Sequence, residues 1–339
     1  MRSVIEELVS YQDFPVISVI AGLGEDLREN EIKLRGVLAH AFDLTPKMLL
    51  KVDRDIFFAR LEFMLSEMSS QAHPKGVALF IGKDFVRIVP LNYSAKDRIV
   101  IDSTGAIAEV VYSWRMFPYF NVIVLSSRGA RVYKTCGESM VETKKCQLVD
   151  HVSRLLKNRI EGSNAAQCDD GKNDVSKGVS TQKLHHAFLA LLKNLDFPAI
   201  VFGSDLIAPL CPEMAKYMSG FAEGDFEYVS NAEIGRAASE MADAWVKGKV
   251  QQALSSIVNF EYCQKLAFGF DEVITQLQRC RVENLYLEEL SNLSNEVCDS
   301  HKLSPADKLI SAALKSGADV FFLPHDNLSK FDGVAGGLR

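Results

Sequence analysis

The clearest candidates for a binding function are the lysines and arginines of the stretch 128–159. Eight basic side chains lie there beside only three acidic ones. Such a local concentration of positive charge suits a phosphate backbone, and it acts over a Debye length of roughly 8–10 Å whatever the net charge of the chain. The alternative is a solvated face with scattered ion pairs. The predicted RNA contacts are Arg128, Arg131, Lys134, Lys144, Lys145, Arg154, Lys157 and Arg159.

Charge is unevenly shared along the chain, whose net charge is −6. Residues 1–119 carry −2, residues 120–218 carry +3 and residues 219–339 carry −7. The basic stretch thus lies in the positive part of an acidic protein, which favours a local contact over a general coating of nucleic acid. The acidic last part would suit a protein partner at least as well as RNA.

No motif for catalysis or cofactor binding accompanies the basic stretch. Gly22-Leu23-Gly24 follows an apolar run, but Leu27 occupies the place of the third glycine of a dinucleotide fingerprint. No Walker-type GxxxxGK loop, GxSxG elbow or HExxH pair occurs, and none of the seven cysteines forms a CxxC pair. We therefore expect no resident metal and no cofactor, and no such motif names a catalytic residue.

The composition predicts a cytoplasmic protein. No stretch of about eighteen uncharged apolar residues exists, so no transmembrane helix is expected. Glu6 and Glu7 interrupt the apolar pattern of the N-terminus, which argues against a secretory signal. An odd and unpatterned set of seven cysteines is typical of a reducing compartment.

Three blocks of secondary structure must position these residues, and together they predict a multidomain α/β chain of α+β type. The first block, 1–119, is α+β, and we expect its helices to cover one face of a sheet. Its expected elements are helices at the start, near 28–42 and near 52–68, and strands near 14–20, 77–81 and 85–91.

The second block, 120–218, has the strand–helix–strand rhythm of a βαβ-type layer. Its expected elements are strands at 121–126, 130–135 and 199–203 and helices at 147–159 and 182–195. Between the helices, residues 161–181 show no periodicity, and we expect a long loop, which is usually functional or disordered.

The third block, 219–339, alternates helices and strands and predicts an α/β/α sandwich. Asn231 is a candidate N-cap, and Ser304-Pro305 starts a helix with serine as cap and proline at the first helical position. Gly317 is expected to end that helix. Strands are expected at 282–287 and 320–323.

Six short, mostly apolar motifs are distributed along nearly the whole chain. They are Phe14-Pro15-Val16-Ile17-Ser18-Val19, Gly76-Val77-Ala78-Leu79-Phe80-Ile81, Phe120-Asn121-Val122-Ile123-Val124-Leu125-Ser126, Ala130-Arg131-Val132-Tyr133, Arg281-Val282-Glu283-Asn284-Leu285-Tyr286-Leu287 and Val334-Ala335-Gly336-Gly337-Leu338-Arg339. In this order and spacing the chain resembles the bacterial branch of the archaeo-eukaryotic release-factor superfamily, relatives of the class-one release factor and Pelota. Cys280 stands where the family's "GRVETL" strand usually has glycine.

The resemblance implies a ribonuclease-H-like middle domain and a last domain similar to the kink-turn-binding ribosomal-protein fold. In release factors the long middle-domain loop carries a Gly-Gly-Gln tip that positions water in the peptidyl-transferase centre. Here the matching loop, 161–181, reads Ala165-Ala166-Gln167, and alanine does not readily take the positive φ that glycine allows. Gln167 is thus only a weak catalytic candidate, and the first block shows no clear match to a codon-reading domain.

The function expected on this basis is a non-hydrolytic ribosome-associated factor for rescue, quality control or hibernation. It would fill a tRNA-like site, with the basic middle domain facing rRNA of the large subunit and the last domain meeting a translational GTPase or another protein. One alternative is an enzyme that cleaves tRNA or peptidyl-tRNA. Another is a stress-linked protein adaptor that makes no RNA contact.

Overall fold

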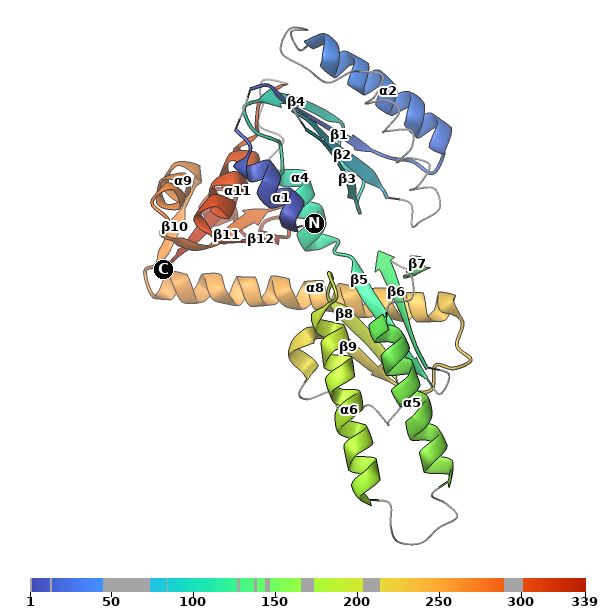
Figure 1. Ribbon diagram of the computed structural model, residues 1–339. Coiled ribbons are helices and arrows are strands. Elements are labelled where there is room, and N and C mark those ends of the chain that lie inside the picture. The colour runs from blue at the N-terminus through green and yellow to red at the C-terminus, as the bar shows by residue number, and fades with distance from the viewer. Residues whose placement is uncertain are drawn as a thin grey trace. The chain divides into compact units, whose positions relative to one another are not determined.

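The chain is a mixed α+β protein with three sheets, as its sequence predicts (Figure 1). The computed structural model describes residues 2–12, 14–44, 74–83, 85–126, 129–136, 139–143, 147–165, 174–203, 214–289 and 301–339. Contacts divide the chain into two compact units. The split unit combines residues 1–117 with 248–339, and the middle unit comprises residues 118–247. The division into domains at 1–119, 120–218 and 219–339 stays a proposal.

The first sheet of the split unit is antiparallel throughout and has the order β3-β2-β1-β4. Its strands are β1 (Val16–Gly22), β2 (Gly76–Ile81), β3 (Val86–Leu91) and β4 (Arg98–Asp102). The strands predicted near 77–81 and 85–91 form an antiparallel hairpin, β2–β3, in which Ile81 pairs with Val86. The predicted helix near 52–68 lies outside the described residues.

Helices cover both faces of this sheet, so the prediction of one covered face was wrong. Helix α2 (Leu27–Leu44) buries Leu34, Leu38 and Phe42 against one face. Helices α1 (Arg2–Ser10) and α4 (Ala108–Met116) cover the other face. The reason is that β1 and β2 are buried along their whole length, which requires apolar cover on both sides.

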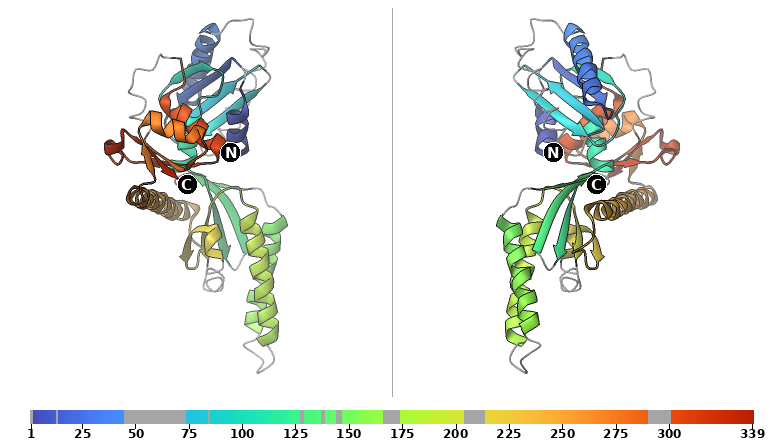
Figure 2. Two further views of the ribbon diagram at one scale, coloured as in Figure 1. Left: turned by 90° about the vertical axis from the view of Figure 1, so that its left-hand side faces the viewer. Right: turned by 90° about the vertical axis from the view of Figure 1, so that its right-hand side faces the viewer.

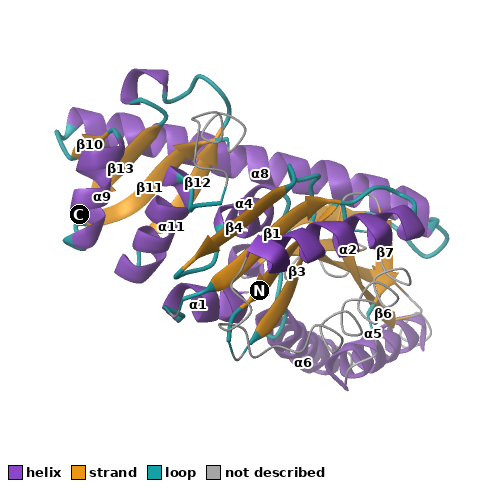
Figure 3. Cartoon of the chain, turned by 90° about the horizontal axis from the view of Figure 1, so that it is seen from above, coloured by secondary structure: helices purple, strands orange, loops and turns teal. Residues whose placement is uncertain are grey.

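The second sheet of the split unit has the order β10-β13-β11-β12, in which β11 and β12 are parallel and β13 is antiparallel to β10 and β11. Its strands are β10 (Leu266–Phe268), β11 (Val282–Glu288), β12 (Asp319–Leu323) and β13 (Val334–Leu338). Helices α9 (Phe270–Gln278) and α11 (Pro305–Ser316) pack on one face. The end of α8 (Asn231–Tyr262) packs on the other, which confirms the predicted α/β/α layering (Figure 3).

Local signals set the ends of these helices. Ser304 and Asp307 form a capping box at the start of α11, Pro305 is its first residue, and Gly317 ends it with φ of 72°. At the start of α8 the cap is Ser230 rather than the predicted Asn231. The Ser230 hydroxyl donates to Glu233 Oε2 at 2.7 Å and accepts from the Glu233 N–H at 3.3 Å, so the capping box begins one residue earlier.

The middle unit holds a five-stranded sheet of order β7-β6-β5-β8-β9. Strands β5, β6 and β7 are antiparallel neighbours, whereas β5, β8 and β9 run parallel, which is the arrangement expected of a ribonuclease-H-like domain. The strands are β5 (Phe120–Ser126), β6 (Gly129–Cys136), β7 (Ser139–Glu142), β8 (Ala199–Gly203) and β9 (Met218–Glu223).

Helices also cover both faces of the middle sheet. Helices α5 (Gln147–Ala165) and α6 (Asp174–Lys193) pack on one face through residues such as Val152 and Phe188. The first part of α8 packs on the other face through Ile234 and Ala238.

The loop predicted over 161–181 is shorter than expected, because α5 continues to Ala165 and α6 begins at Asp174. Both helices extend beyond the strands as a pair (Figure 2). The sequence pattern failed here because a helix that has left the sheet needs no apolar stripe facing a sheet. Among the described residues, no helix is long and apolar enough to span a bilayer.

Candidate functional site

The outer face of α5 presents the clearest of the predicted RNA contacts. Val149, Val152 and Leu156, at three- and four-residue spacing, bury the inner face of the helix against the sheet. Arg154 and Lys157 therefore fall on the outer face, and both are exposed. They are three residues apart, so their charged groups share one stripe of the helix.

A cleft of about 290 Å³ lies where α5 meets the hairpin of β6 and β7. Ser153 fixes its floor, because its hydroxyl accepts from the Ala130 N–H at 2.8 Å. Gly129, with φ of 126°, allows this approach, since a Cβ there would come within 2.9 Å of the Ser153 side chain. The cleft is lined by Ala130, Arg131, Val132, Glu142, Thr143, Val149, Asp150, Ser153 and Lys157.

Charges in the cleft are mixed rather than uniformly basic. Its lining contains Lys157 and two carboxylates, Glu142 of β7 and Asp150 of α5. The Arg131 guanidinium lies 6.0 Å from the centroid of the Tyr133 ring, which packs in the core on the α8 side of the sheet. Alternate strand residues share a face, so the Arg131 side chain leads away from α5. Arg131 thus lines the cleft from β6 together with Lys157, while its guanidinium lies on the α8 side of the sheet.

Lys134 is held by aromatic rings. Its Nζ lies 4.0 Å from the centroid of Tyr119 and 4.8 Å from that of Phe197. Such cation–π contacts stabilise by about 0.5–2 kcal/mol, depending on exposure. Lys134 therefore has a packing role in the middle unit whatever else it contacts.

Several predicted residues fall outside the described part of the chain. These are Arg128, Lys144, Lys145 and the weak catalytic candidate Gln167, together with the side chain of Arg159. In the sequence, Arg128 directly precedes Gly129, and Lys144 directly follows Thr143 of the cleft lining.

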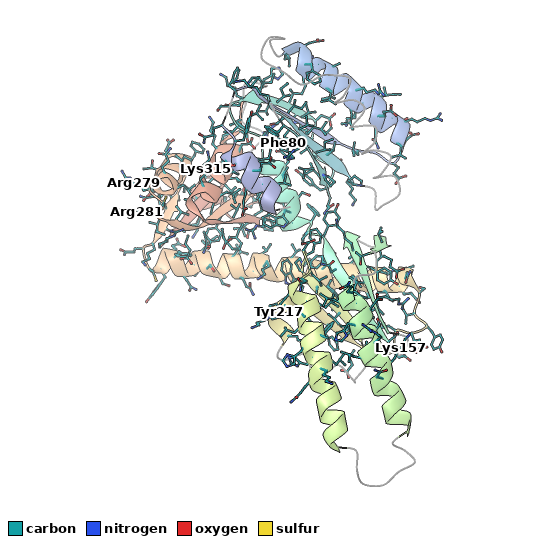
Figure 4. All side chains as sticks on the ribbon, in the orientation of Figure 1. Phe80, Lys157, Tyr217, Arg279, Arg281 and Lys315 are labelled. Carbon is teal, nitrogen blue, oxygen red and sulfur yellow. The ribbon has the colours of Figure 1, made fainter. Side chains whose placement is uncertain are left out.

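Two further lysines of the middle unit lie near one aromatic ring, and the sequence did not predict that they would be close together. Lys193 Nζ lies 5.7 Å from the centroid of Tyr217, and Lys216 Nζ lies 4.9 Å from it. Figure 4 labels Tyr217 and Lys157 on this unit. Lys193 ends α6 and Lys216 precedes β9, so their proximity depends on a tertiary contact that no sequence spacing announces.

The strongest charge cluster of the split unit is buried. Arg98 on β4 pairs with Asp307 of α11 and, at 3.0 Å, with Glu109 of α4. Asp307 is completely buried and also accepts from the Ala108 N–H at 2.9 Å. Burial, and next the charge of Asp307, raise the pKa of Glu109 to about 7, while Arg98 opposes the shift.

This cluster serves the fold. It joins the first sheet to α11, and a dissolved substrate cannot reach the buried Asp307 carboxylate. Within the described residues, no three histidine, cysteine, aspartate or glutamate side chains lie together as metal ligands would. Of the predicted RNA contacts on α5, Arg154 and Lys157 are exposed on the described surface of the middle unit.

No family model matches the chain, and no curated protein matches it. Among solved structures, an archaeal translation termination factor, aRF1, matches with 14% identity and a TM-score of 0.24, covering 100% of this chain and 96% of that one. A Saccharomyces cerevisiae protein, Dom34, matches with 12% identity and a TM-score of 0.43, covering 78% and 73%. Archaeal Pelota, from a model of ribosome-bound Pelota and ABCE1, matches with 10% identity and a TM-score of 0.46, covering 100% and 94%.

Proposed function

We propose that the chain is a cytoplasmic, release-factor-like protein that binds the ribosome at a tRNA-like site and does not hydrolyse peptidyl-tRNA. Its role would be rescue, quality control or hibernation. The three solved structures named above superpose with TM-scores below 0.5, so they carry no argument about function. The proposal is therefore argued from the residues of the chain itself.

The observation that carries the proposal is the exposed pair Arg154 and Lys157 on the outer face of α5. The pair lies on a helix that packs on a sheet of ribonuclease-H-like order, in the block whose net charge is +3 within a chain of −6. Exposed cations without an apolar anchor suit a phosphate backbone better than a protein core. We propose rRNA of the large subunit as the partner of this face.

The proposed non-hydrolytic mode is supported by the sequence from the last residue of α5 onward. A Gly-Gly-Gln tip would need glycine freedom beside the glutamine, and Ala165-Ala166 stands there instead. The acidic last block, at −7, is the proposed contact for a protein partner such as a translational GTPase.

The test is co-sedimentation of the purified protein with 70S ribosomes and separated subunits over a salt series. We expect binding that needs the large subunit and weakens as salt rises. The variant R154E/K157E should bind at least about tenfold more weakly, and its salt slope should fall by roughly 0.7–0.9 for each lost phosphate contact.

The matched control is R236E/K247E, which reverses two exposed charges on α8, on the opposite side of the middle sheet. It should bind as the parent does. Equal binding by the parent and R154E/K157E would refute the proposed face, and no binding at low salt would refute the ribosomal function.

A further inference from the structure

Five basic residues gather at one end of the second sheet of the split unit. We call them the basic rim: Lys265, Arg279, Arg281, Lys315 and Arg339. All five are exposed. Figure 4 labels three of them, Arg279, Arg281 and Lys315, around α9 and α11.

Backbone hydrogen bonds fix three members of the rim side by side. The Leu338 N–H donates to Lys265 O at 2.8 Å, and the Arg339 N–H donates to Arg281 O at 2.9 Å. Lys265, Arg339 and Arg281 therefore lie at the ends of the neighbouring strands β10, β13 and β11. Neighbouring strands are about 4.8 Å apart, so the three residues form a row about 10 Å long.

Helix ends add the other two members. Arg279 is the C-cap of α9, and Lys315 is in the last turn of α11. The Arg339 guanidinium donates to Ser316 O at 3.2 Å, which ties the row of strand ends to the end of α11. Cations at helix C-termini complement the helix dipole, which accounts for these two positions alone. The helix dipole does not account for Lys265 and Arg281, because these two residues lie at the starts of strands.

The rim is not neutralised by its surroundings. In the part of the chain that the structure describes, none of its five members forms an ion pair with a side-chain carboxylate. Two carboxylates belong to the same end of the sheet, Glu283 and Asp319, and Asp319 is engaged with Arg115 at 3.3 Å. This positive cluster lies in the block of residues 219–339, which carries −7.

The side chains favour RNA over an acidic protein as the ligand. Protein interfaces centre on a buried apolar patch depleted of charge. In their described residues, α9, β11, α11 and β13 carry no exposed large apolar side chain, and Phe268, which is exposed on β10, lies at the end of that strand away from Lys265. Three of the five cations are arginines, whose planar forks match phosphate oxygens in bidentate fashion. Tyr262, three residues before Lys265, is 89% exposed, and such a ring suits the stacking of an unpaired base.

We propose that the basic rim binds single-stranded RNA, with its cations on successive phosphates and Tyr262 stacked on a base. The inference goes beyond the proposed function and does not depend on it, because the rim and the Arg154–Lys157 pair belong to different compact units.

The test is fluorescence anisotropy of the full chain with a short unstructured RNA over a KCl series. The variant R279Q/R281Q/K315Q removes three cations whose side chains make no hydrogen bond or ion pair among the described residues, so folding should be kept. We expect at least about tenfold weaker binding, and a salt slope smaller by roughly 2, from about 0.7 per phosphate contact on a single strand. Tyr262→Ala should weaken binding by about fivefold or more and leave the salt slope unchanged.

The matched control is K75Q/K96Q/K308Q, which removes the same charge from exposed positions of the same unit. It should bind RNA within about twofold of the parent, since nonspecific attraction by net charge is all that it loses. Equal losses in the rim and control variants would overturn the proposal. So would a polyglutamate peptide that competes as well as RNA of equal charge, because the rim would then be a protein contact.

The two proposals fail separately. If R154E/K157E and the parent both fail to sediment with ribosomes while RNA binding still depends on the rim, the inference stands and the proposed function falls. If RNA binding is lost in R154Q/K157Q and unchanged in the rim variant, the inference falls.

Discussion

Arg98 is the residue on which the stability of the split unit should depend most sharply. It faces Asp307, which is completely buried, and Glu109, whose side chain is 13% exposed. Arg98→Ala would leave a buried carboxylate without its cation, and removing one partner of a buried pair costs about 3–5 kcal/mol. Urea unfolding followed by circular dichroism measures the loss.

The control for Arg98 is an ion pair that is close to solvent. Arg87 donates to Glu7 at 2.9 Å, with both side chains about two-fifths exposed. Arg87→Ala should change the free energy of unfolding by about 0–1 kcal/mol. If the two substitutions cost the same, burial would not govern the Arg98 cluster.

Glu109 should make the stability of the chain depend on pH. Its pKa is raised to about 7 by burial and then by Asp307, from an ordinary value of 4.5. Between these values the folded state binds more protons than the unfolded state, so the contribution of Glu109 to stability falls as pH rises from about 4.5 to about 7. Glu109→Gln removes this titration, and the stability of the parent relative to the variant should therefore decline over that range.

The measurement for Glu109 is urea unfolding of both proteins at a series of pH values. Parallel pH profiles for parent and variant would contradict the shifted titration. Asp307→Asn offers no such test, because it would also break the capping box with Ser304.

At the scale of elements, strand β13 depends on glycine for its packing. A Cβ at Gly337 would meet the ring of Phe260 on α8 at 2.6–2.9 Å. Gly337→Ala should destabilise the split unit by about 1–3 kcal/mol, because the ring must move to make room.

Gly248 is the matched glycine. It lies within α8, and a Cβ there would meet nothing within 4 Å. Gly248→Ala should raise the free energy of unfolding by about 0.5–1 kcal/mol, since alanine is the better helix former. Thermal unfolding of the two variants should move the midpoint in opposite directions, and a shift in the same direction would refute the packing argument.

Sequence reasoning succeeded where the signal was local. The serine cap and proline at the start of α11 are adjacent in the chain, Gly317 directly follows its last residue, and strand β5 is a mostly apolar run. It missed Ser230 by one residue, since serine and asparagine cap helices about equally well. The candidate site was foreseen only in part. Helical periodicity places Arg154 and Lys157 outward, but the rings around Lys134 come from distant segments.

At the scale of the whole molecule, no local pattern in the sequence indicated that the first and last blocks share a core. Phe80 and Val111 from the first block lie in one apolar cluster with Leu285 and Leu309 from the last. The composition of each block alone is compatible with a separate hydrophobic core. Only the long-range contacts show that the first and last blocks share one. The middle unit, by contrast, is one continuous segment, 118–247.

This arrangement predicts how fragments behave. Residues 118–247, expressed alone, should unfold in a single cooperative transition, because they keep their sheet and both covering layers. Residues 1–117 alone should not, because helices α1 and α4 lose the apolar partners that α11 and β12 of the last block supply. Adding residues 248–339 in trans should restore the transition. Cooperative unfolding of 1–117 alone would contradict the shared core.

The shared core also sets an order of events during synthesis. Val334 belongs to the apolar cluster that the first and last blocks share. It is synthesised 217 residues after Phe117, the last residue of the first segment. At about 5–20 residues per second, the first segment leaves the ribosome roughly 10–45 s before its core can be completed. The continuous middle segment can fold during that wait. During that time the first segment exposes apolar surface. It is therefore the part of the nascent chain that we expect a chaperone to bind.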